Sequence, residues 1–224
     1  PFITQRFFEI NLVKNTAQDL GRATGGSGQV AQVCEMNGNV YMASYTKGQM
    51  VAYDPLKPAH FPENPHIVCE PPEPAMRPVA MCKDENNIYY SNSHEYGSLG
   101  SMMVKYTEDS SAVIAENPIP NHMIRSLTDE KELDLLIAGT TFIADCNSVP
   151  PVDHHCKLAL LVKQTLRPVR IMDCETGFDQ ISVVGQLSEC RYLIAATNIY
   201  LEFEHGSKFY LLDTRAFTLT PFPL

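Results

Sequence analysis

The chain has 224 residues, of which 44% are hydrophobic and 19% are charged, as is typical of a folded globular protein. Its 26 acidic residues outnumber 17 lysines and arginines, and the net charge of -9 opposes binding to phosphate backbones. We therefore expect no nucleic-acid partner. The longest apolar runs, such as residues 158–162, are too short to cross a bilayer, so no membrane anchor is expected.

The seven cysteines are scattered along the chain without CxxC spacing, and several fall inside apolar strand patterns. This distribution favours buried free thiols over disulfides or metal ligands, and it favours the cytoplasm over secretion. The sequence also contains no Asn-x-Ser/Thr glycosylation acceptor, which agrees with that compartment.

The first 27 residues predict two strands, at residues 7–11 and 17–21. These strands align with the third and fourth strands of the repeats that follow. We therefore interpret residues 1–27 as the second half of a four-stranded unit.

Four longer repeats follow, at residues 28–74, 75–121, 122–177 and 178–224. Each predicts a short apolar strand centred on a small residue, a polar turn, a second strand that ends in small residues, and two further strands. The matched small residues are Ala31, Ala80, Ser126 and Ser182.

The matched residues lie roughly 46 to 56 positions apart, which is the length of one β-propeller blade. No segment carries a helical apolar period for more than a turn or two, so a helical solenoid is excluded. We predict an all-β protein with four complete four-stranded blades and two strands of a further blade. Such a chain is a whole domain or part of a larger propeller of six or seven blades.

Residues 40–55 (VYMASYTKGQMVAYDP) and 77–106 (RPVAMCKDENNIYYSNSHEYGSLGSMMVKY) resemble bacterial β-propeller repeats with a GTYPxGxLxxYDP blade followed by an RPxAM…YGxLGGxLxxYD blade. The resemblance implies a propeller of the NHL-like or gluconolactonase-like group, a group with no agreed activity. Ala43 and Ser44 replace the Gly-Thr of that pattern, and Thr46 replaces its Pro. No catalytic role is therefore carried over.

The loops between strands 2 and 3 of each blade, together with the junctions between blades, emerge on one face of a propeller, where ligands usually bind. Five of the seven histidines fall in these segments: His94, His122, His154, His155 and His205. The candidate ligand-binding residues are Tyr45, Arg77, His94, Glu95, Tyr96, His122 and Arg125.

Each of these candidates also has a structural interpretation. Arg77 and Arg125 could bind a carboxylate or phosphate, or they could pair with an acidic neighbour. Tyr45 and Tyr96 could stack on a sugar ring, although tyrosines on blade strands more often belong to the core. His154 and His155 are candidate metal ligands, but adjacent residues of a strand point to opposite sides, so we expect no metal site and no cofactor.

No Gly-x-Ser-x-Gly, HExxH or paired Cys/His nucleophile motif is present. We therefore favour a non-catalytic binding or scaffold module that recognises a small molecule, a glycan or a protein on the channel face. One alternative is a propeller lyase or lactone hydrolase with a His/Arg/Tyr or metal site at the channel mouth. A further alternative is a sensor or assembly domain of a longer polypeptide, with other blades or domains as its partners.

Overall fold

The computed structural model describes residues 5–25, 28–199 and 206–223, and the chain forms two compact units, residues 1–78 and 79–224. Strands dominate both units. Within the described ranges there is no α-helix, and the one helical turn is a 3-10 turn at Asp145–Asn147. No described helix is long and apolar enough to span a membrane.

The N-terminal unit contains a two-stranded sheet and a four-stranded sheet, both antiparallel. The two-stranded sheet consists of β1 (Arg6–Asn11) and β2 (Thr16–Arg22), as predicted for the opening half-unit. Side chains of both sheets form one core, in which the Phe7 ring meets the Tyr53 ring edge-on at a centroid distance of 4.9 Å. The four-stranded sheet runs in chain order through β3 (Val30–Met36), β4 (Asn39–Ser44), β5 (Gln49–Tyr53) and β6 (His66–Cys69).

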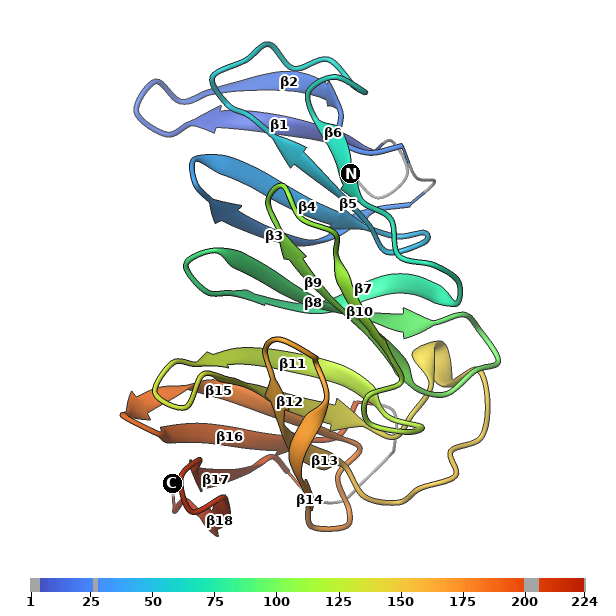
Figure 1. Cartoon of the computed structure of the whole chain (residues 1–224), viewed down its shortest axis with the longest axis vertical. Helices are drawn as coiled ribbons and strands as arrows, with labels where there is room; N and C mark the ends of the chain where they lie inside the picture. The colour runs from blue at the N-terminus through green and yellow to red at the C-terminus, as the bar shows by residue number, and fades with distance from the viewer. Residues whose placement is uncertain (1–4, 26–27, 200–205, 224) are drawn as a thin grey trace. The chain divides into compact units, whose positions relative to one another are not determined.

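Strand β7 (Ala75–Lys83) crosses the boundary between the units and begins a second four-stranded sheet. This sheet continues with β8 (Asn87–His94), β9 (Ser101–Thr107) and β10 (Val113–Glu116). The third sheet consists of β11 (Met123–Glu130), β12 (Leu135–Thr141), β13 (Lys157–Val162) and β14 (Pro168–Asp173). The fourth consists of β15 (Gln180–Ser188), β16 (Arg191–Thr197), β17 (Lys208–Asp213) and β18 (Thr218–Pro221). The predicted four-stranded units are thus confirmed, and Figure 1 shows them in successive colours along the chain. One backbone pair, Thr141 with Gln180, joins the third and fourth units into a single eight-stranded sheet.

The β11–β14 sheet buries both of its faces, because successive residues of a strand point to opposite sides. On β12, Leu136 and Ala138 pack into the core shared with the β7–β10 sheet, whereas Ile137 packs into the core shared with the β15–β18 sheet. A sheet covered on both sides needs apolar residues at consecutive positions, and β12 accordingly begins with the apolar run Leu-Leu-Ile-Ala.

In the C-terminal unit, the first strand of one sheet lies against the second strand of the sheet before it. The hydroxyl of Ser91 on β8 donates a 2.9 Å hydrogen bond to the carbonyl oxygen of Ile124 on β11. At the next junction, between β12 and β15, the close approach occurs at Gly139. A Cβ added there would overlap the Ile181 carbonyl oxygen and lie 2.7 Å from Oγ of Ser126. Ser126 Oγ in turn accepts a 3.0 Å hydrogen bond from the amide of Val183.

The strand registers correct one of the predicted equivalences. Ile124 pairs with Thr140 and Ser126 with Gly139, so Arg125 is the bulged residue of β11. In β3, Val30 pairs with Ser44 and Gln32 with Ala43, so the bulge falls on Ala31. By register it is Gln32 that corresponds to Ser126, and the alignment of Ala31 with Ser126 is wrong by one residue.

A buried ion network joins the β7–β8 turn of the second sheet to the β11–β12 and β13–β14 turns of the third sheet. Lys163 is 5% exposed. Its ammonium nitrogen lies 2.7 Å from a carboxylate oxygen of Asp129 and 3.1 Å from one of Asp134. Burial disfavours its charged form, but the hydrogen bonds to these two carboxylates outweigh that effect, and the pKa of Lys163 lies above its ordinary value. Asp84 lies 3.7 Å from the same ammonium and accepts a 2.7 Å hydrogen bond from the Tyr89 hydroxyl.

We predict that Gly139→Ala lowers the free energy of unfolding by about 1–3 kcal/mol, because the added methyl group forces the β15 backbone away from β12. Urea denaturation followed by circular dichroism measures the change. Gly185→Ala is the matched control, since no atom lies within 4 Å of a Cβ added at that position. Its expected change is below about 0.5 kcal/mol. Equal stability of both variants would contradict the close approach at Gly139.

Candidate functional site

In the C-terminal unit, the loops that were predicted to share a face do contact one another. The hydroxyl of Ser93, near the end of β8, donates a 3.2 Å hydrogen bond to the buried carboxylate of Asp145 in the β12–β13 loop. The amide of Gly97 donates a 3.0 Å bond to Oγ of Ser148 in the same loop. We call the surface formed by loops 95–100 and 142–156 the loop face.

His122, from the junction before β11, lies fully buried beneath the loop face. Its Nδ1 is 2.8 Å from the Pro120 carbonyl oxygen, and its Nε2 is 2.9 Å from the His155 carbonyl oxygen. The Nε2 atom also lies 3.6 Å from the Asp153 carboxylate. Both ring nitrogens therefore face acceptors of the protein itself, and the ring ties the junction to the β12–β13 loop.

Asp153 organises that loop. Its carboxylate accepts hydrogen bonds from the amides of His154 (2.8 Å) and His155 (3.3 Å), and it lies 3.2 Å from the Lys157 ammonium. Partial burial raises the pKa of Asp153, but these amides and Lys157 together lower it to about 2. Lys157 also pairs with Asp173 across the β13–β14 ladder at 2.5 Å. We call His122, Asp153, Lys157 and Asp173 the Asp153 cluster.

The other predicted residues of this unit differ in exposure. Glu95 and Tyr96 are exposed on the loop face, as is His154. His94 is 6% exposed, and its Nδ1 lies 2.9 Å from the Leu99 carbonyl oxygen. Nε2 of His94 is buried, with no hydrogen-bond partner among residues 5–25, 28–199 and 206–223.

Arg125 and His155 are half-buried, and each has its own partner. The Arg125 Nε donates a 3.1 Å hydrogen bond to the Gln180 side chain, and His155 Nδ1 lies 3.0 Å from the Cys174 carbonyl oxygen. The acidic neighbour considered for Arg125 is thus replaced by a neutral amide. His94, Arg125 and His155 bond to three separate groups.

Tyr45 and Arg77 meet within the N-terminal unit, where the guanidinium carbon lies 4.9 Å from the centre of the Tyr45 ring. This is the geometry of a cation–π interaction. Both side chains are half-buried. Gly28 is required beside them, because a Cβ at this position would overlap the Tyr45 ring and carbonyl. The pair could offer an aromatic face and a positive charge to a sugar acid.

His205 lies outside the described residues. Within the described part of the chain, no group of three His, Cys, Asp or Glu side chains is arranged to hold a metal ion. All seven cysteines are free, and Cys69, Cys156, Cys174 and Cys190 are buried. Burial raises the pKa of the Cys174 thiol to about 12, so this thiol is not a nucleophile near neutral pH.

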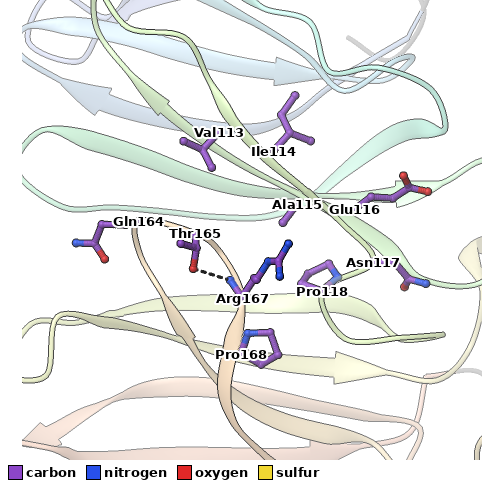
Figure 2. A pocket seen from close by; sticks show the side chains of 10 residues that line it. All are labelled: Val113, Ile114, Ala115, Glu116, Asn117, Pro118, Gln164, Thr165, Arg167 and Pro168. Carbon is purple, nitrogen blue, oxygen red and sulfur yellow. Dashed lines mark hydrogen bonds between the residues drawn. The ribbon is translucent and has the colours of Figure 1, made fainter.

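A groove of about 820 Å³ on the side of the C-terminal unit was not predicted. It lies between β10 with the residues that follow it and the turn from β13 to β14, as Figure 2 shows. The lining residues are Val113, Ile114, Ala115, Glu116, Asn117, Pro118, Gln164, Thr165, Arg167 and Pro168. No motif marks this groove, because its two walls come from segments that are far apart in the sequence.

The fold is similar to solved structures of very different sequence. Kuenenia stuttgartiensis hydrazine synthase matches with a TM-score of 0.66 at 8% identity, over 98% of this chain and 60% of that one. The Myceliophteria thermophila Cps50 (Swd1) β-propeller domain matches with a TM-score of 0.60 at 11% identity, over 98% and 65%. The Dos1 propeller matches with a TM-score of 0.57 at 10% identity, over 95% and 49%.

The chain is therefore an all-β protein of the β-propeller class, with four four-stranded blades and two strands of a further blade. It spans between 49% and 65% of the three solved structures. No protein-family model and no curated protein matches the sequence. Membership of the bacterial repeat family that the sequence resembles stays a prediction.

We predict that Asp153→Asn lowers the free energy of unfolding at pH 7 by up to about 2 kcal/mol. The folded-state pKa of Asp153 is depressed to about 2, so its contribution is present above the unfolded pKa near 3.8 and is lost as the pH falls toward 2. The stability difference between wild type and variant should therefore vanish between pH 4 and pH 2. Denaturation at a series of pH values measures it, and a difference that persists at pH 2 would contradict the electrostatic role.

Proposed function

We propose that this chain is a non-catalytic β-propeller binding module whose loop face recognises a small molecule, a glycan or a protein. The main support for this proposal is that the Asp153 cluster fixes the β12–β13 loop through contacts inside the protein. His122, Asp153 and Lys157 direct their polar atoms at the protein itself, so the loop is ordered without a ligand. A loop held in this way loses little conformational entropy on binding.

The exposed side chains on this ordered surface have the chemistry of a recognition site. Tyr96 presents an aromatic ring, Glu95 a carboxylate and His154 an imidazole, and the Gly97–Ser148 hydrogen bond joins the loops that carry them. Rings of this kind stack on sugars or on protein side chains, while the charged groups select the orientation. Sensing or assembly within a longer polypeptide would use the same surface.

The enzyme alternative requires several of Arg77, His94, Arg125 and His155 to act on one point. Within the C-terminal unit, His94, Arg125 and His155 hold separate partners, and this arrangement favours recognition over catalysis. Turnover of a lactone or a uronide by the purified chain, lost in His155→Ala, would replace the binding proposal with the enzyme alternative.

We expect one class of compound to raise the melting temperature of the purified chain in a thermal-shift panel of neutral sugars, sugar acids, lactones and glycans. Saturating ligand at about 100 times its Kd stabilises the folded state by about 2.7 kcal/mol, which is easily detected. Tyr96→Ala should abolish the shift. Phe8→Ala is the control, since Phe8 is 47% exposed and Tyr96 is 48% exposed. Equal loss in both variants, or a shift unaffected by either, would count against the loop face.

A further inference from the structure

One wall of the groove that Arg167 lines is the open edge of strand β10. β10 is the outermost strand of its sheet and pairs only with β9 among the described strands. Its other edge therefore carries backbone N–H and C=O groups that no strand uses. Val113 and Ala115 turn toward the core, while Ile114 and Glu116 are exposed. An extended segment laid along this edge could form a ladder with residues 113–116.

The equivalent position at the next blade junction is filled by the protein itself. There, the Arg170 side chain from β14 crosses to the β17–β18 turn, donating a 3.4 Å hydrogen bond to the Ala216 carbonyl and lying 5.9 Å from the Phe217 ring centre. Leu166 and Phe217 both adopt positive φ, at 59° and 54°, so the β13–β14 and β17–β18 turns correspond. Since β10 has no arginine, the corresponding space beside it stays open.

The second wall of the groove supplies a positive charge. Figure 2 shows the Arg167 side chain extending from the β13–β14 turn toward Ala115 and Pro118. The residue is exposed, and no carboxylate among the described residues lies within ion-pair distance of its guanidinium. Arginine binds a carboxylate through two parallel hydrogen bonds. Because the chain carries a net charge of -9, a strongly anionic ligand would be repelled, and a single carboxylate fits best.

We propose that this groove binds an extended peptide segment of another protein, which adds a strand to β10 and places one Asp or Glu side chain on Arg167. The backbone edge provides affinity for any extended segment, and Arg167 provides selectivity for the acidic residue. Pro118 and Pro168 line the groove and offer apolar contacts to the flanking residues. The groove uses neither Tyr96 nor His155, so its ligand is independent of the one proposed for the loop face.

The test is selection of a phage-displayed random heptapeptide library on the whole chain, followed by measurement of the enriched peptides as synthetic fluorescent ligands. Enriched peptides should contain one acidic residue between β-branched residues. Their Kd should rise by about tenfold or more in Arg167→Glu. Replacing the acidic residue of the peptide by lysine should restore binding to Arg167→Glu. Hydrogen exchange should slow at residues 113–116 when the peptide is bound.

Arg215→Glu is the matched control, because the Arg215 side chain is 63% exposed on the corresponding turn of the next blade. Its Kd should stay within about twofold of wild type, since the variant leaves the groove unchanged. The proposal is overturned if no peptide is enriched on wild type relative to Arg167→Glu, or if exchange slows elsewhere. Peptides that depend on Tyr96 and not on Arg167 would overturn the groove proposal while supporting the loop face.

Discussion

The architecture of the C-terminal unit depends on close contact between the backbones of successive blades. At the junction between β12 and β15 only Gly139 fits, because the Ile181 carbonyl oxygen occupies the space of a side chain. Hydroxyl groups make further contacts of this kind, since Ser91 and Ser126 bond directly to the backbone of the following blade. These contacts fix the spacing of the blades, and this spacing sets the positions of the loops that the blades carry.

Polar groups lock each end of the blades in a different way. At one end, Lys163 joins aspartates of two blades, and Glu130, which is fully buried, accepts a 2.8 Å hydrogen bond from the Thr214 hydroxyl. Removing one partner of such a buried network is costly, because the remaining charge is left without compensation. At the other end, the Asp153 cluster fixes the β12–β13 loop through His122 and Lys157. The first arrangement joins neighbouring blades, and the second fixes the course of a single loop.

The repeat pattern predicted the sheets well, because small residues, polar turns and apolar strands recur at blade length. It failed at Ala31, since a bulge inserts one residue without leaving a recognisable residue type. Part of the candidate surface was also predictable, because polar loops such as residues 95–96 follow strand ends. The burial of His94 and His122 was not, since a loop histidine has the same sequence context whether exposed or covered. Lys157 and the groove at Arg167 depend on cross-strand and cross-blade contacts that no local pattern records.

One backbone pair links the last two blades more tightly than packing alone. Thr141 at the end of β12 pairs with Gln180 at the start of β15, so their eight strands form one continuous hydrogen-bonded sheet. Side chains of these two blades also share a common core, so exposing the backbone of one blade to solvent disturbs the packing of the other. Loss of the final blade would therefore expose core residues of its neighbour, such as Ile137 and Leu158, and weaken that blade as well.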